Sequence, residues 1–141
     1  TNWVVPLGPN VDAFETALEN YLGENKKVVA LTSGTAAIHL ALVACGVRAG
    51  DEVITQSFTF CASANPITYL GATPIFIDSE RETWNMNPQL LEEAIKNRIE
   101  KTGKTPKAII TVSIYGMPYK IDEIGVEAHH YSQRRSSTLV V

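Results

Sequence analysis

The stretch "KVVALTSGTAAIHLALVACG", residues 27–46, decides the fold of this chain. Its first five residues form an apolar run typical of a buried strand, and an almost wholly apolar helix follows until a glycine ends it. We expect that helix to be largely covered by the rest of the molecule. Three small polar residues, Ser33, Gly34 and Thr35, stand at the junction. In a parallel sheet covered by helices, such a junction lies at the edge where ligands bind.

The same alternation of strand-length and helix-length apolar runs continues along the chain. The runs are nearly continuous rather than alternating in hydropathy, which indicates strands covered on both faces. The sequence therefore predicts an α/β fold of three layers, a mostly parallel sheet with helices on both faces. The expected strands are 27–31, 51–56, 73–78 and 107–114, and the expected helices are 10–23, 35–46, 60–71 and 87–103.

Composition excludes several classes of protein. The chain has 141 residues, of which 45% are hydrophobic and 19% charged, as in an ordinary globular domain. A net charge of -3 argues against nucleic-acid binding, because such proteins carry a basic surface. No apolar run is long enough to span a membrane and no signal peptide is evident, so we expect a cytoplasmic protein without a membrane partner. Cys45 and Cys61 form no metal-binding pattern and are interpreted as buried thiols.

The junction itself has two interpretations. A helix N-terminus offers unpaired N–H groups and the positive end of the helix dipole. Gly34 would allow close approach of a ligand, and the hydroxyls of Ser33 and Thr35 would add donors, which together make a phosphate site. Alternatively, Ser33 or Thr35 only caps the helix, and on this stretch alone capping is the simpler interpretation.

Four stretches, in this order, carry a resemblance to a known family. They are "ALTSGTAAIHLAL" (30–42), "GDEVITQSFTFCASANPITYLGATPIFID" (50–78), "ETWNMNP" (82–88) and "IYGMPYKIDEI" (114–124). Together they resemble the DegT/DnrJ/StrS family of pyridoxal-phosphate-dependent aminotransferases, most of which place an amino group on a nucleotide-linked keto sugar. The resemblance implies that residues 1–124 are part of the large domain of the PLP-transferase fold type I, and that 125–141 are a divergent or truncated segment.

The resemblance also implies roles for individual residues. Gly34 and Thr35 match positions that hold the cofactor phosphate, which agrees with the helix-terminus argument. Phe60 matches the aromatic position that stacks on the pyridine ring. We interpret Phe58 as a core residue. These three, Gly34, Thr35 and Phe60, are the expected cofactor-binding residues.

Other polar residues receive no role. Asn65 and Tyr115 lie near the active-site edge by resemblance and are left unassigned. His39, inside an apolar helix, is interpreted as a core histidine. The neighbours His129 and His130 point in different directions on a helix and have no supporting ligands, so no metal site is expected.

The end of the chain departs from the family. Relatives continue to an aspartate that pairs with the pyridine nitrogen and to a lysine that links covalently to the cofactor, whereas "SQRRSSTLVV" (132–141) matches nothing. We therefore expect a piece of a longer enzyme that contains no catalytic residue, binds pyridoxal phosphate weakly or not at all, and is inactive alone. Residues 132–137 are expected to form a loop, and "TLVV" (138–141) could pair as an edge strand.

Three interpretations of function remain open. The first is the phosphate-binding half of an aminotransferase acting on a nucleotide sugar, which self-associates because part of its apolar surface is uncovered. The second is a non-catalytic regulatory protein of DegT type, although no DNA-binding element is visible. The third is part of a pyridoxamine-phosphate-dependent sugar dehydratase, in which a histidine replaces the lysine.

Overall fold

The computed structural model describes residues 7–23, 25–132 and 139–140. Among these residues, no helix is both long and apolar enough to cross a membrane. The elements follow in the order α1 (Pro9–Leu22), α2 (Gly34–Ala44), β1 (Glu52–Gln56), the 3-10 turn η1 (Cys61–Ser63), α3 (Asn65–Tyr69), β2 (Thr73–Ile77), α4 (Pro88–Thr102), β3 (Ala108–Ile110), the 3-10 turn η2 (Ile114–Gly116), α5 (Ile121–Ser132) and β4 (Leu139–Val140).

The sheet has four parallel strands in the order β2-β1-β3-β4. At its centre, Ile54 of β1 stands opposite Ile75 of β2 and Ile109 of β3. Pro74 lies in the edge strand β2, where its missing N–H costs no sheet hydrogen bond. The mostly parallel sheet is confirmed.

The end of the chain supplies the other edge strand. β4 pairs with β3 through Leu139 opposite Ala108, so the pairing expected of residues 138–141 is confirmed for 139–140. Ser132, expected to begin a loop, closes α5 instead. The rest of the predicted loop, 133–137, lies outside the described residues.

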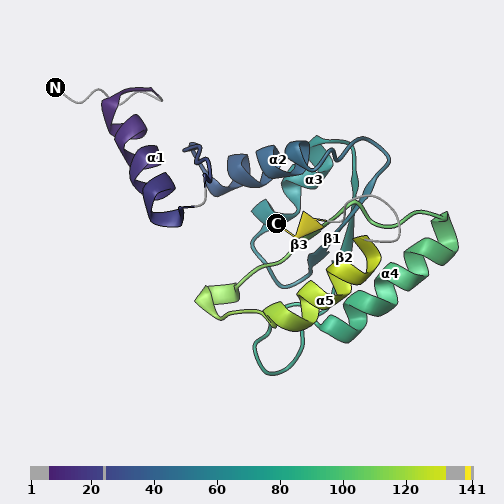
Figure 1. The fold of residues 1–141 in the computed structure, drawn as a ribbon. Helices are drawn as coiled ribbons and strands as arrows, with labels where there is room; N and C mark the ends of the chain where they lie inside the picture. The colour runs from purple at the N-terminus through teal and green to yellow at the C-terminus, as the bar shows by residue number, and fades with distance from the viewer. Residues whose placement is uncertain (1–6, 24, 133–138, 141) are drawn as a thin grey trace.

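Helices cover both faces of the sheet, as predicted (Figure 1). Successive residues of β1 point to opposite faces, so Val53 packs in a core with α2 and α3. Ile54 packs on the other side in a core with α4 and α5. Both residues are fully buried, so the two cores hold a three-layer structure together.

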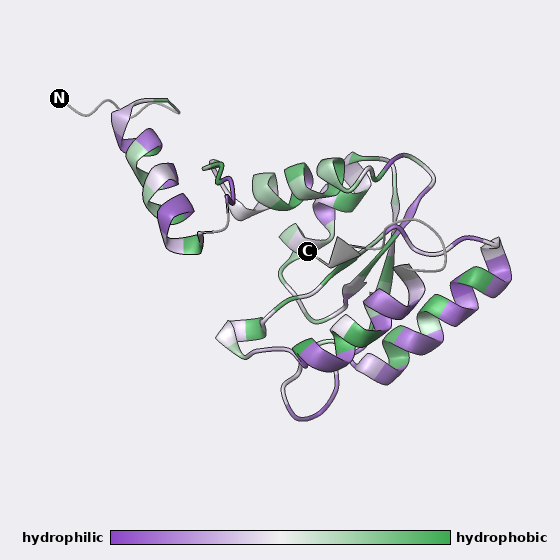
Figure 2. Cartoon of the chain, in the orientation of Figure 1, coloured by the Kyte–Doolittle hydropathy of each residue, from purple (hydrophilic) through white to green (hydrophobic). Residues whose placement is uncertain are grey.

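The helix α4 forms as its sequence predicts. The Asn87 side chain accepts hydrogen bonds from Gln89 N at 2.9 Å and Leu90 N at 3.2 Å, and Pro88 occupies the first turn. The helix buries Leu91 and Ile95 against the sheet. Hydrophobic and hydrophilic stripes therefore alternate around α4 and α5 (Figure 2).

The strand predicted at 27–31 is wrong. This segment is irregular, and no described strand lies beside it. Instead, the backbone N–H groups of Val28 and Ala30 donate to the carboxylates of Glu19 at 3.2 Å and Glu15 at 2.7 Å, both on α1. An apolar run becomes a strand only when another strand pairs with it, and here side chains take the N–H groups.

The expected covering of the apolar helix is also wrong, as is the burial of the cysteines. In α2 only Leu42 is buried, whereas Leu40 and Val43 are about half exposed because no described element packs on that side. Cys61 is exposed, since it begins η1 beyond the end of β1, and Cys45 is partly buried. Burial raises the pKa of the Cys45 thiol.

Two further elements are shorter than predicted. The helix expected at 60–71 is divided into η1 and the five-residue α3. The strand expected at 107–114 spans only Ala108–Ile110, because the chain turns into η2 soon afterwards.

Candidate functional site

The N-terminus of α2 lies at the carboxyl edge of the sheet. A short turn, in which Asp51 N donates to Arg48 O at 3.0 Å, leads from the end of α2 into the start of β1. The helix therefore runs antiparallel to the strand, and its first turn returns to the edge where β1 ends. Contacts between α2 and η1, which follows β1, agree with this placement.

At this N-terminus the polar junction is open to solvent. Ser33 caps the helix, because its Oγ accepts from Ala36 N at 3.1 Å. Ala37 N donates to Ser33 O at 3.0 Å, whereas the N–H groups of Gly34 and Thr35 have no acceptor in the described part of the chain. A Cβ at Gly34 would meet nothing within 4 Å. The open N–H groups of Gly34 and Thr35 suit an anion, and the Ser33 cap does not occupy them.

Phe60 stands at the same edge. Its side chain is 77% exposed, and its backbone is extended at the point where η1 begins. Ser63 N donates to Phe60 O at 3.0 Å, and the hydroxyls of Thr59 and Ser63 lie 2.8 Å apart. The backbone is therefore fixed while the ring is free to stack on a planar ligand.

Two aromatic interpretations need correction. Phe58 is not a core residue: it is 46% exposed and meets the ring of Trp84 edge-on, with ring centroids 6.0 Å apart. It lies past the end of β1, where no helix of the described residues buries it. His39 is not in the core either, because it is only partly buried and packs edge-on against Tyr69.

The remaining polar candidates do not gather into a site. Asn65 begins α3, and both His129 and His130 are exposed on α5. Among the described residues, no group of three His, Cys, Asp or Glu side chains could hold a metal ion.

Sequence reasoning missed a polar network at this edge. Gln56, the last residue of β1, and Asn85 are both fully buried. Their signal was a polar residue inside or directly after an apolar run, as in "VITQ" and "TWNM". Two exposed aromatics close to Asn85, Trp84 and Tyr115, have left-handed backbones with φ of 62° and 49°. Such strain in bulky residues is uncommon and gathers at functional sites.

Glu80 organises the loop that carries Trp84. Its carboxylate accepts from the N–H groups of Glu82 and Thr83, both at 2.7 Å. It also accepts from the Thr83 hydroxyl. The Thr83 hydroxyl is the main cause that lowers the pKa of Glu80, with a smaller contribution from Lys120. The carboxylate thus stays ionised and holds the loop closed.

Most lysines are engaged away from the α2 junction. Lys27 pairs with Glu19 at 3.1 Å, Lys96 with Glu92 at 2.6 Å and Lys120 with Glu82 at 2.8 Å. Two others, Lys104 and Lys107, line a hollow at the opposite edge of the sheet.

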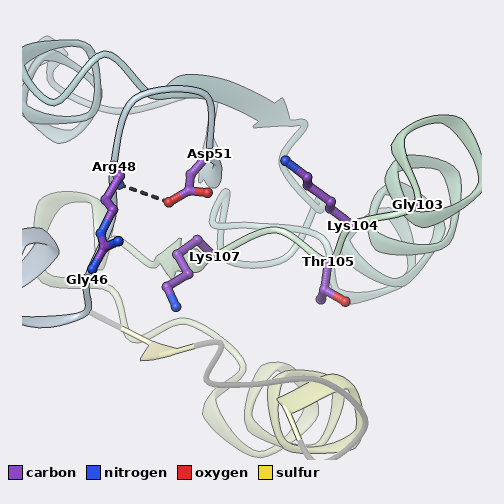
Figure 3. A pocket seen from close by; sticks show the side chains of 7 residues that line it. All are labelled: Gly46, Arg48, Asp51, Gly103, Lys104, Thr105 and Lys107. Atoms are coloured by element: carbon purple, nitrogen blue, oxygen red, sulfur yellow. Dashed lines mark hydrogen bonds between the residues drawn. The ribbon is translucent and has the colours of Figure 1, made fainter.

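That hollow, of about 560 Å³, is explained without a ligand (Figure 3). The helices α2 and α4 both end beside it, and the C-terminal end of a helix is negative. Arg48, Lys104 and Lys107 line the hollow, where positive side chains are favourable, and the Asp51 carboxylate accepts from Arg48 N at 2.9 Å. The open N–H groups lie at the other edge, so the candidate site is placed there.

Known proteins resemble this chain in sequence and in fold. EpsN of Bacillus subtilis, provisionally named a pyridoxal phosphate-dependent aminotransferase, is 52% identical over 124 residues, which are 88% of this chain and 31% of EpsN. The GDP-perosamine synthase of Caulobacter vibrioides is 42% identical over 124 residues, with the same two coverages. A DegT DnrJ EryC1 StrS aminotransferase structure from Brucella abortus matches with a TM-score of 0.81 and 36% identity, over 95% of this chain and 34% of that one.

The chain thus spans about a third of the length of the relatives it matches. The model of the DegT/DnrJ/EryC1/StrS aminotransferase family matches residues 1–132, which extends past residue 124 to the end of α5. This match covers nearly the whole chain, and the layered fold with its open helix N-terminus agrees with it. The chain belongs to the DegT/DnrJ/EryC1/StrS family of aminotransferases.

Proposed function

We propose that this chain supplies the cofactor-phosphate and ring-stacking part of a pyridoxal-phosphate-dependent aminotransferase that acts on a nucleotide-linked keto sugar. The open N–H groups at the start of α2, beside the exposed Phe60, are the observation that carries the proposal. The nucleotide-sugar substrate is supported by the likeness to GDP-perosamine synthase, and the cofactor by the likeness to EpsN. We propose that residues 1–124 are part of the cofactor-binding large domain and that 125–141 are a divergent or truncated segment, of which 125–132 still match the family model.

The residues present fit the phosphate of the cofactor. Gly34 and Thr35 would hold it through their backbone N–H groups and the Thr35 hydroxyl, at the positive end of the α2 dipole. Ser33 keeps the helix start rigid by its cap, so the donors need no rearrangement. Phe60 would keep the planar ring of the cofactor in one orientation and exclude water from that side.

The chemistry that pyridoxal phosphate supplies is the temporary storage of electrons during amine transfer. That step needs an amine from the protein, and five of the seven lysines are held elsewhere by carboxylates or line the opposite edge. We therefore propose that the chain by itself binds the cofactor weakly, forms no specific covalent link with it and does not transfer an amino group.

Binding of pyridoxine 5'-phosphate tests the proposal, because this probe has the ring and phosphate but no aldehyde to react with surface lysines. Its affinity should fall roughly tenfold or more in Gly34→Val, the change that a loss of about 1.4 kcal/mol gives. The space around Gly34 is open, so the variant should fold. Amide chemical shifts of residues 34 and 35 would follow the titration.

The matched control is Ala37→Val, which adds the same side chain one turn further along α2, at an exposed position. Its affinity should equal that of the unchanged chain, and pyridoxine without phosphate should bind neither protein measurably. Equal affinity in Gly34→Val and Ala37→Val would reject the phosphate site and leave Ser33 as a helix cap only.

Assembly and location belong to the same proposal. Large apolar side chains are exposed on α1 and α2, including Phe14, Tyr21, Leu40 and Val43, and their burial would favour association. We propose that copies of the chain self-associate, in the cytoplasm. Sedimentation should show the average mass rising with concentration, and a monomer across a wide range would contradict it.

A further inference from the structure

We propose that Asn85 is a positioning residue that, together with Gln56, ties together the three loops at the carboxyl edge of the sheet. These loops are residues 57–60 after β1, 78–87 after β2 and 111–117 after β3. The proposal rests on the proposed function only in assigning this edge to the cofactor.

The first step is the clamp on the loop after β3. The fully buried Asn85 donates through Nδ2 to Met117 O at 2.8 Å, and its Oδ1 accepts from Ile114 N at 2.9 Å. One amide thus bridges the two ends of η2. Between them stands Tyr115, which is left-handed and 96% exposed.

The clamp explains how the strain persists. A bulky residue in the left-handed region needs surrounding structure that over-determines it. Two hydrogen bonds lie within the turn, from Gly116 N to Ser113 O at 3.0 Å and from Met117 N to Ile114 O at 2.9 Å. The side chain of Asn85 adds two more from outside the turn, which fixes the direction in which Tyr115 projects.

The second step links this clamp to β1. Met86, directly after Asn85, donates its N–H to Gln56 Oε1 at 3.2 Å. The Nε2 of the same buried Gln56 donates to Phe58 O at 2.8 Å, two residues before Phe60. On its other side Asn85 is preceded by Trp84, which is left-handed as well and 61% exposed.

The position of the network gives it a function. The connection after β1 leaves through α3 on one face, and the connection after β3 leaves through α5 on the other. Such a divergence is where α/β sheets bind ligands. Asn85 and Gln56 therefore hold Phe60, Trp84 and Tyr115 in fixed relative positions around this point, and the loops open and close as one unit.

Amide hydrogen exchange tests this inference without any cofactor, so its result is independent of the proposed function. In Asn85→Ser, exchange at Ile114 should become roughly tenfold faster or more, because its N–H loses the Asn85 acceptor. Met86 keeps its bond to Gln56, so its exchange should rise with that of Ile114 only because the loops open as one unit. The amides of Ile54 and Ile109 in the sheet should still exchange only through global unfolding of the variant. Asn97→Ser, the same change at an exposed site on α4, is the control and should change none of them.

The unchanged chain provides a second measurement, should Asn85→Ser fail to fold. Ile114 and Met86 belong to different loops, yet a shared unit should give them equal protection within about threefold. The inference is overturned if their protection differs by an order of magnitude, or if Ile114 keeps full protection in Asn85→Ser. A loss of protection that is equal in the sheet and in the loops would overturn it too.

Discussion

The helices α1 and α4 have similar apolar periodicity but opposite surroundings. In α4, Leu91 and Ile95 are buried against the sheet, whereas α1 buries none of its residues. Figure 1 shows α1 standing apart from the layers, and Figure 2 shows hydrophobic bands along it. Its side chains Phe14, Tyr21 and Leu22 are exposed. The comparison teaches that periodicity predicts a helix and its apolar face, but not whether a partner for that face lies within the chain.

The two helices are also held by different forces. α4 is held mainly by burial, with the Arg98 guanidinium bonding both oxygens of Glu52 on β1 in addition. α1 is tied to residues 27–30 by the carboxylates of Glu15 and Glu19. Burial withstands changes of pH and salt, whereas carboxylate contacts near the surface do not.

Truncation of apolar side chains should separate the two helices most strongly. Ile95→Ala should lower the free energy of unfolding by about 2–5 kcal/mol, because it leaves a cavity in a close-packed core. Phe14→Ala on α1 should change it by less than about 0.5 kcal/mol, since the ring is already exposed. Urea denaturation followed by circular dichroism measures both. Comparable losses would mean that α1 is packed in solution.

A smaller effect is expected from the ion pair that joins α4 to β1. Arg98→Lys should destabilise the chain less than Ile95→Ala, because a lysine keeps the charge but cannot bond both carboxylate oxygens of Glu52. The control variant is Lys96→Met, which removes an exposed ion pair with Glu92 within α4. It should have almost no effect on the free energy of unfolding. The difference between the two variants in urea midpoint should shrink at high salt. A larger loss in Lys96→Met would reverse this ranking.

The layered part of the fold could be predicted because each of its apolar segments packs against, or pairs with, another described segment of the chain. The strands at 52–56 and 73–77 and the helix α4 follow their patterns closely, and the pattern of 138–141 allows the edge strand found at 139–140. The segment 27–31 failed for the opposite reason. Its apolar run resembles the others, but pairing is a property of two segments, and no second segment is present among the described residues.

The site was predictable where chemistry is local. A cap with open N–H groups follows from Ser33, Gly34 and Thr35 alone, so the junction could be identified from the sequence. Asn85 could not, because its partners Ile114 and Met117 are 29 and 32 residues away along the chain. Nor could the left-handed backbones of Trp84 and Tyr115, which the neighbouring loops impose.

The smallest expected effect is the release of α1 at low pH. The N–H of Val28, followed by the ammonium of Lys27, lowers the pKa of Glu19 below its ordinary value of 4.5. A lowered pKa means that the folded contact favours the ionised carboxylate. The contact should therefore be complete above pH 4.5 and weaken as the pH falls through the lowered pKa, when the carboxylate gains a proton.

Exchange of the Val28 amide should follow this transition, while Ile95 in α4 keeps its protection over the same range. Glu19→Gln should give the weakened contact at every pH, because a neutral amide accepts the N–H less strongly than a carboxylate. Glu93→Gln on the exposed side of α4 is the matched control and should leave Val28 unchanged. If Val28 were equally protected in Glu19→Gln and the unchanged chain, the link between α1 and 27–30 would rest on burial. The two helices would then differ only in how much surface they bury, and not in the kind of interaction that holds them.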